Sequence, residues 1–235
     1  MKLCVIFDID ETLIHFIDEI NYHVWENTSA KDKKRLTYKE ENRQVYIFRP
    51  FLREMFSFFM KNRSTISVGL WTFADAKYAA KVGEEIVKFC NLPKDFFLFI
   101  YSIDDISGPY PKDLRHVYSN FPECNKSNTL LVDNLASNIN HKINKNNGIV
   151  IPAFAPYGFN RKPDPSLNGA DEIRNTATSL EHKKAQRDVC LRDIIQIFKV
   201  KVKDKGGSQN QKTRKRRRRS LVQMSFKKRY KACSR

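Results

Sequence analysis

Two aspartates one residue apart, Asp8 and Asp10, follow directly on a short apolar run, Leu3 to Phe7. The run is rich in β-branched and aromatic residues, so it predicts a buried strand. Side chains alternate between the faces of a strand, so Asp8 and Asp10 point the same way just beyond its carboxyl end. Two carboxylates held so close repel each other. The pair therefore favours a divalent hard cation as its partner.

The elements that must position this pair alternate along the chain. After the first strand, apolar runs at 65–71, 96–101, 129–132 and 148–151 are separated by helical patterns. Thr72 follows the first of these runs, Lys112 opens a short helix, and Asp133-Asn134 follows the third. Alternating strands and helices predict an α/β fold with a doubly wound parallel sheet, which binds ligands at the carboxyl ends of its strands.

Four strings of residues resemble the four motifs of the haloacid dehalogenase-like superfamily. Within it they are similar to the RNA polymerase II C-terminal-domain phosphatases, including the small ones. The strings are Asp8-Ile9-Asp10-Glu11-Thr12-Leu13-Ile14-His15, then Leu70-Trp71-Thr72 with Ala76-Lys77-Tyr78-Ala79, then Tyr110-x-Lys112-Asp113-Leu114, and Leu131-Val132-Asp133-Asn134-x-Ala136-Ser137-Asn138. The resemblance covers about residues 1–155 and is weaker over 156–200. It implies a Rossmann-like fold with a small insertion between the first two motifs.

The resemblance implies a Mg²⁺-dependent phosphoserine/phosphothreonine phosphatase. A carboxylate is ionised at neutral pH, so Asp8 can attack phosphorus without a general base and form an aspartyl-phosphate. Asp10 would protonate the leaving oxygen and then take a proton from the hydrolytic water. Mg²⁺ is expected on Asp8, on the backbone carbonyl of Asp10 and on Asp133. The predicted substrate-binding residues are Thr72, Lys112 and Asn134.

Each residue matched to the later motifs has a structural alternative. Thr72 would bond a phosphoryl oxygen, or it could cap the helix that follows. Lys112 would neutralise charge on the phosphoryl group, or it could be a solvated charge at the start of its helix. Asp133-Asn134 would bind metal and substrate, or it could be a capping pair.

The chain departs from the family pattern at two places. Relatives hold the substrate phosphate with an arginine between the second and third motifs, and this sequence has none between Arg63 and Arg115. Asp75 replaces an apolar residue, and an acid there is expected to weaken docking of a proline side chain. The segment 16–44 predicts an irregular or hairpin-like insertion near the site, or a solvated linker. The resemblance implies that this insertion helps to admit a peptide. Phosphatase chemistry is therefore better supported than the polymerase tail as substrate.

The net charge of +17 is concentrated near the C-terminus. Residues 201–235 hold 15 of the 43 Lys and Arg and one of the 26 acidic residues. We therefore expect a phosphatase domain over 1–200 and a disordered basic tail over 201–235. The tail suits contact with an import receptor or non-specific contact with nucleic acid, or it only adds solubility. A nuclear location is expected, otherwise a cytoplasmic one.

Composition excludes other classes of protein. The five cysteines are scattered and form no Cys-x-x-Cys pair, which suits a reducing compartment and argues against a zinc knuckle. No apolar run approaches the roughly 18 residues that span a bilayer. Acids within the first 20 residues argue against a signal peptide. A monomer without membrane contact is expected.

Two other functions compete with a protein phosphatase. A polynucleotide-end phosphatase would use the same carboxylates, with the basic tail as a tether to nucleic acid. An inactive relative would serve as a nucleic-acid-tethered binding module, although every motif residue is present.

Overall fold

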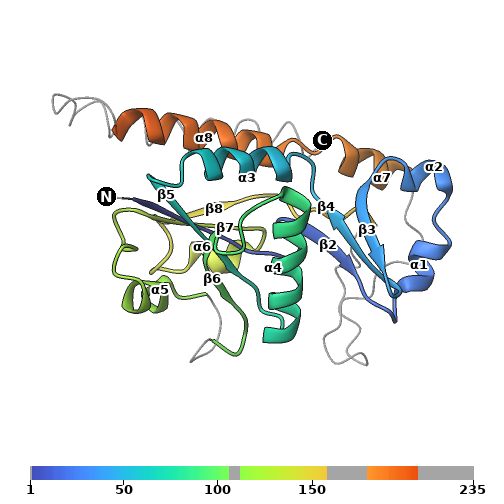
Figure 1. The fold of residues 1–235 in the computed structure, drawn as a ribbon, viewed down its shortest axis with the longest axis horizontal. Coiled ribbons are helices and arrows are strands. Elements are labelled where there is room, and N and C mark those ends of the chain that lie inside the picture. The colour runs from blue at the N-terminus through green and yellow to red at the C-terminus, as the bar shows by residue number, and fades with distance from the viewer. Residues whose placement is uncertain (1, 106–111, 158–178, 206–235) are drawn as a thin grey trace. The chain divides into compact units, whose positions relative to one another are not determined.

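The computed structural model describes residues 2–105, 112–157 and 179–205, and the chain divides into two compact units, 1–191 and 192–235. The first unit is built on a five-stranded parallel sheet of order β6-β5-β1-β7-β8 (Figure 1). Its strands are β1 (Leu3–Phe7), β5 (Ile66–Trp71), β6 (Phe97–Tyr101), β7 (Thr129–Asp133) and β8 (Gly148–Val150). The chain moves outward from β1 to β6 and then returns to β7 on the other side of β1. The predicted α/β fold is confirmed, with its topological switch point between β1 and β7.

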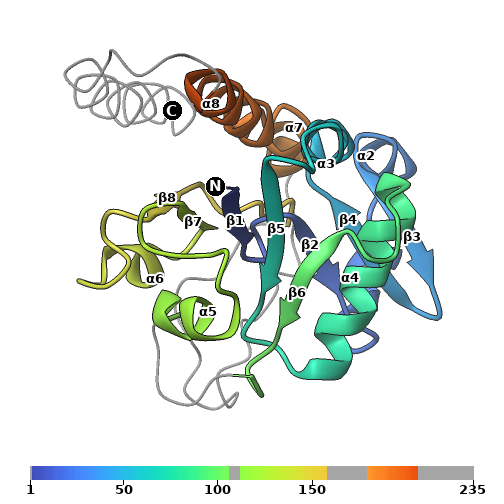
Figure 2. The same ribbon diagram turned by 60° about the vertical axis from the view of Figure 1, so that its left-hand side comes forward.

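Helices cover both faces of this sheet (Figure 2). They are α3 (Leu52–Lys61), α4 (Ala76–Cys90), α5 (Leu114–Asn120) and α6 (Ala136–Asn140). The ring of Phe7 lies 6.1 Å from that of Phe56 and 5.7 Å from that of Phe59, both on α3. Its neighbour Ile6 shares a buried cluster with Leu114 of α5. Because successive strand residues face opposite sides, β1 is buried by a helix on each face.

The insertion between the first two motifs is a small sheet with its own core. It comprises β2 (Ile14–Ile17), α1 (Tyr22–Glu26), α2 (Ala30–Lys33), β3 (Thr37–Glu41) and β4 (Gln44–Phe48), and the strands pair antiparallel in the order β2-β4-β3. Trp25 is fully buried in it and donates from its indole nitrogen to Glu40 at 2.9 Å. The expectation of a hairpin-like segment was therefore incomplete, and the solvated linker is wrong.

Two helices depart from what their apolar patterns predict. The helix expected from Leu135 to about Asn144 stops at Asn140, because the Asn144 side chain turns inward and donates to the carbonyl of Asn138 at 2.7 Å. The helix expected over 171–200 is two helices, α7 (Ser179–Gln186) and α8 (Cys190–Lys205), and 171–178 lie outside the described residues. Asp188 separates them, since its carboxylate accepts from the Cys190 backbone nitrogen at 2.8 Å.

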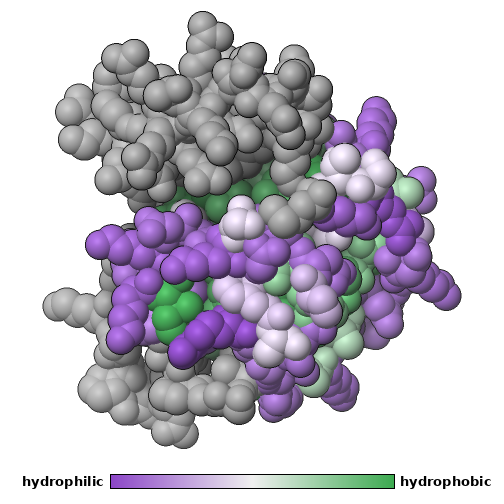
Figure 3. Space-filling view, turned by 90° about the vertical axis from the view of Figure 1, so that its left-hand side faces the viewer, coloured by the Kyte–Doolittle hydropathy of each residue, from purple (hydrophilic) through white to green (hydrophobic). Residues whose placement is uncertain are grey.

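The second unit contributes most of α8, whose apolar residues recur at helical spacing. Residues 206–235 lie outside the described part, so the domain over 1–200 and the tail over 201–235 stay predictions. None of the described helices is both long and apolar enough to cross a bilayer. On the face seen in Figure 3, the coloured residues are mainly hydrophilic and the hydrophobic ones form small patches.

A buried arginine fixes the loop that follows β1. Arg49 is 1% exposed, and its guanidinium donates to the carbonyls of Thr12 at 3.0 Å and Pro152 at 2.8 Å. It also pairs with the Asp188 carboxylate at 2.7 Å. One side chain thus joins the loop after β1 to the segment after β8 and to the start of α8.

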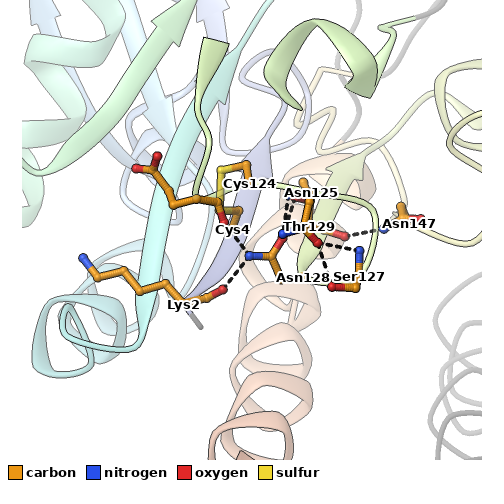
Figure 4. The surroundings of a disulfide bond; sticks show 9 residues. Lys2, Cys4, Cys124, Asn125, Ser127, Asn128, Thr129 and Asn147 are labelled. Carbon is orange, nitrogen blue, oxygen red and sulfur yellow. Dashed lines mark hydrogen bonds between the residues drawn. A yellow bond between two sulfur atoms is a disulfide. The ribbon is translucent and has the colours of Figure 1, made fainter. Parts of the chain in front are cut away.

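A disulfide joins Cys4 of β1 to Cys124, which precedes β7 (Figure 4). The Cα atoms are 5.7 Å apart, and the two residues are 1% and 2% exposed. The pairing of β1 with β7 sets Cys4 opposite Thr129, and this brings Cys124 close. The Asn128 side chain connects the two segments, because it donates to the backbone carbonyls of Lys2 and Glu123 (Figure 4). The scattered cysteines were expected to suit a reducing compartment, and the disulfide departs from that expectation for Cys4 and Cys124. The sequence did not predict the pair, because the contact depends on strand order.

Reduction of the Cys4–Cys124 disulfide should destabilise the fold. The bond joins positions 120 residues apart, so its loss should lower the free energy of unfolding by about 3–5 kcal/mol. Urea unfolding with and without a thiol reductant measures the difference. In the control, a variant with both Cys4→Ala and Cys124→Ala should not respond to reductant. Equal midpoints for the oxidised and reduced wild type would contradict the prediction.

Loss of the Arg49 guanidinium should also destabilise the fold. Arg49→Met leaves the Asp188 carboxylate without its buried partner, so we expect a loss of about 3–5 kcal/mol in urea unfolding. Arg49→Lys keeps the charge but loses the planar guanidinium group. Its free energy of unfolding should lie between those of Arg49→Met and wild type. Arg63→Met is the matched control, because it breaks an exposed ion pair with Asp95 and should cost far less. Similar losses of unfolding free energy for Arg49→Met and Arg63→Met would show that the buried contacts of Arg49 do not stabilise the fold.

Candidate active site

Three neighbouring strands end where the predicted site residues lie. In the parallel pairing, Phe7 of β1 stands opposite Leu70 of β5 on one side and Val132 of β7 on the other. Asp8 follows Phe7, and Asp133 follows Val132 on the neighbouring strand. On the other side, Thr72 follows Trp71, the last residue of β5. Asp8 and Asp133 are 7% and 0% exposed. The switch point of the sheet thus places two carboxylates side by side.

Lys112 lies between these two carboxylates. It is fully buried, and its ammonium donates to Asp8 Oδ1 at 2.5 Å, to Asp133 Oδ2 at 3.1 Å and to the carbonyl of Trp71 at 2.6 Å. The Asn144 amide donates to the Lys112 carbonyl and fixes its backbone. A lysine with all of its donors used inside the protein is not a solvated charge, so that alternative is wrong.

Burial and like charges control the electrostatics of the cluster. Burial raises the pKa of Asp8 to about 7, the Lys112 ammonium opposes this shift, and Asp133 and Asp10 add to it. Burial alone would lower the pKa of Lys112, but the carboxylates of Asp8 and Asp133 raise it above its ordinary value. Lys112 therefore keeps its charge, and one ammonium faces two acids in a region that excludes water.

Two hydroxyl groups donate to the carboxylate of Asp10. Thr72 Oγ1 donates to Asp10 Oδ2 at 2.7 Å, and the Tyr78 hydroxyl donates to Asp10 Oδ1. Burial, together with Asp10, raises the pKa of Tyr78 well above its ordinary value, so the phenol remains a donor. The cap of α4 is Asp75, whose carboxylate accepts from the Tyr78 backbone nitrogen at 2.8 Å. Thr72 is therefore not the cap of this helix.

Hydrogen bonds at the start of α6 fix the carboxylate of Asp133. Its Oδ1 accepts from the backbone nitrogen of Leu135 at 2.7 Å, at the entrance to α6. Its Oδ2 accepts from Asn138 at 2.9 Å as well as from Lys112. Asn134, the third predicted substrate-binding residue, follows it and is half-buried. These contacts fix the carboxylate of Asp133 with its face toward Asp8.

The donor set fits a magnesium ion. Asp8 Oδ2 is buried and has no hydrogen-bond partner. Mg²⁺ in phosphoryl-transfer sites takes one or two carboxylates and completes its octahedron with water and substrate oxygens. Within the ranges the structure covers, no three His, Cys, Asp or Glu side chains gather around a metal position. Asp8, Asp133 and the Asp10 carbonyl would hold the ion, since the Asp10 side chain accepts from Thr72 and Tyr78.

Sequence reasoning missed several residues that shape the site. Arg49 holds the loop after β1, Asn138 fixes Asp133, and Tyr78 contacts Asp10. The position of Tyr78 carried a signal, because it lies in the first turn of a helix that starts at the carboxyl edge of the sheet. In the described part of the chain, Lys112 is the cation bonded to Asp8, and Arg49 is engaged with Asp188 and backbone carbonyls.

Comparison with solved structures places the fold. The chain is similar to a variant of the fission yeast RNA polymerase II CTD phosphatase Fcp1 bound to beryllium fluoride, with 18% identity and a TM-score of 0.50 over 86% of this chain and 65% of that one. A second structure, of Fcp1 as an essential RNA polymerase II CTD phosphatase, matches at 18% identity and a TM-score of 0.47, over 86% and 64%. This chain therefore spans about 65% of the length of the first structure. At such identity, the first match shows that the two chains share a fold.

No curated protein matches the chain significantly. A protein-family model, that of the NLI interacting factor-like phosphatases, matches residues 3–190 and so includes every strand and all the site residues described above. The resemblance in the four motifs is thereby confirmed. The chain belongs to the NLI interacting factor-like phosphatase family.

Proposed function

We propose that the protein is a Mg²⁺-dependent phosphatase that acts on phosphoserine or phosphothreonine in proteins through an aspartyl-phosphate on Asp8. The observation that carries the proposal is the buried cluster of Asp8, Lys112 and Asp133 with Asp10 beside it. A nucleophile, a fixed cation and a second carboxylate meet at the switch point of the sheet. Membership of a phosphatase family supports the reaction class.

The first half-reaction transfers the phosphoryl group to Asp8. The ionised carboxylate attacks phosphorus, the bond from phosphorus to the serine or threonine oxygen breaks, and Asp10 gives that oxygen a proton. Lys112 neutralises charge on the transferred group, because its ammonium is already aimed at Asp8 Oδ1. Mg²⁺ held by Asp8, the Asp10 carbonyl and Asp133 would screen the carboxylates from the anionic substrate and orient the phosphoryl group.

The second half-reaction restores the enzyme. Asp10, now ionised, takes a proton from a water molecule whose oxygen attacks phosphorus, and the bond from phosphorus to Asp8 breaks. Inorganic phosphate leaves with the oxygen of that water. Asp10 can serve as acid and then as base because it stands two residues from Asp8 and is fixed by Thr72.

The proposed partners follow from the same reading. A phosphoprotein is the substrate, and the basic residues within 201–235 contact an import receptor or nucleic acid and direct the protein to the nucleus. Among the described residues, Lys112 is the cation that bonds Asp8. Contacts elsewhere on the protein would therefore select the substrate.

Removal of the nucleophile should abolish the activity. Asp8→Asn keeps the size of the side chain but cannot form the aspartyl-phosphate, so the rate on a phosphoserine peptide with Mg²⁺ should fall by at least ~1000-fold. Chelation of the metal should stop the wild type, and added Mg²⁺ should restore it. Asp113→Asn is the control, because this aspartate caps α5 beside Lys112 and asparagine caps equally well. Equal rates for Asp8→Asn and wild type would refute the proposal.

Comparison of substrates should separate protein from nucleic acid. We expect phosphoserine and phosphothreonine peptides to be hydrolysed at least ~10-fold more efficiently, by kcat/KM, than 3′-phosphorylated oligonucleotides. The assay uses the full chain with Mg²⁺ at several salt concentrations, because contact of a basic segment with phosphates weakens as salt rises. A preference for the oligonucleotides would make the protein a polynucleotide-end phosphatase. No turnover of either class would favour a binding module.

A further inference from the structure

We propose that Tyr78 is a positioning residue for Asp10, the acid and base of the reaction. Its hydroxyl, acting with that of Thr72, fixes the carboxyl group so that it can protonate the leaving oxygen. This inference rests on the proposed function and assigns a task to a tyrosine that neither attacks phosphorus nor binds metal.

Both oxygens of Asp10 are engaged by hydroxyl donors. Tyr78 donates to Oδ1, and Thr72 donates to Oδ2 at 2.7 Å. Thr72 Oγ1 also accepts from the Ala74 backbone nitrogen at 3.0 Å, so its hydroxyl group is held on two sides while its proton goes to Asp10. A phenol is a good donor at neutral pH. A carboxyl group bonded on both oxygens cannot rotate freely about its side chain.

Tyr78 is itself held in place from two directions. Its backbone nitrogen donates to the cap residue Asp75 at 2.8 Å, so it belongs to the ordered first turn of α4. Its ring meets that of Phe16 edge to face with centroids 5.2 Å apart. Phe16 lies on β2 and next contacts Tyr46 of β4 at 5.0 Å. The insertion sheet and α4 together thus present the hydroxyl to Asp10.

The consequence depends on the leaving group. A serine or threonine alkoxide is a poor leaving group and needs a proton as the bond to phosphorus breaks, so the alignment of the acid matters. A nitrophenolate leaves readily without a proton. A residue that only positions the acid should therefore affect the first kind of ester much more than the second. A residue that only maintains the fold should affect both equally.

The test measures kcat/KM for a series of substituted phenyl phosphates, from acidic nitrophenols to unsubstituted phenol, with the full chain and Mg²⁺. Tyr78→Phe removes one hydroxyl and keeps the ring that packs on Phe16. We expect kcat/KM for phenyl phosphate to fall about 10-fold and for nitrophenyl phosphate at most about threefold, so that the rate depends more steeply on leaving-group pKa. These small substrates lack a peptide, so contacts with a peptide chain do not contribute.

Tyr46→Phe is the matched control. Tyr46 belongs to the same aromatic cluster, but its hydroxyl bonds Gln44 at 3.3 Å and no carboxylate. For Tyr46→Phe, kcat/KM should depend on the leaving-group pKa as it does in the wild type. A uniform loss across all esters in Tyr78→Phe, or no loss at all, would overturn the positioning role while the wild type remains active. A wild type that hydrolyses none of the esters would instead refute the proposed function itself.

Discussion

One buried ammonium between two buried carboxylates is the constraint on which the site depends. Lys112 can be buried only because Asp8 and Asp133 neutralise it, and these acids can lie side by side only because the ammonium separates their charges. The arrangement requires β1 and β7 to be adjacent and in register, since one residue of slip would turn an acid to the other face. The order of strands is thus part of the electrostatics of the site.

The rest of the molecule keeps these strand ends in register. The disulfide of Cys4 with Cys124 joins β1 to the segment before β7 at the edge of the sheet opposite the acids. At the acidic edge, Arg49 binds the carbonyl of Thr12 and thereby holds the loop after β1. The covalent bond and the buried ion pair act at the two ends of the same strand. Both reduce the freedom of Asp8 relative to its neighbours before substrate arrives.

The sequence allowed the sheet and its catalytic edge to be predicted because these depend on local patterns. Apolar runs identify strands, and a polar residue after each run identifies a residue at the binding edge, as Asp8, Thr72 and Asp133 show. Contacts between distant segments leave no such pattern. Arg49 is bonded to Asp188, 139 positions away, and no periodicity in either segment indicates the partner. The same reason explains why β2, which begins inside the first motif, was not anticipated.

Asp75 shows how a departure from the family pattern can be structural. From the sequence, an acid at this position was expected to weaken docking of a proline side chain. In the structure it is exposed and caps α4, and its bond partner is the backbone nitrogen of Tyr78. The cap orders the turn that brings the Tyr78 hydroxyl to Asp10. The residue therefore bears on the position of the Asp10 carboxyl group through the turn that it caps. Its effect on the choice of substrate stays a prediction.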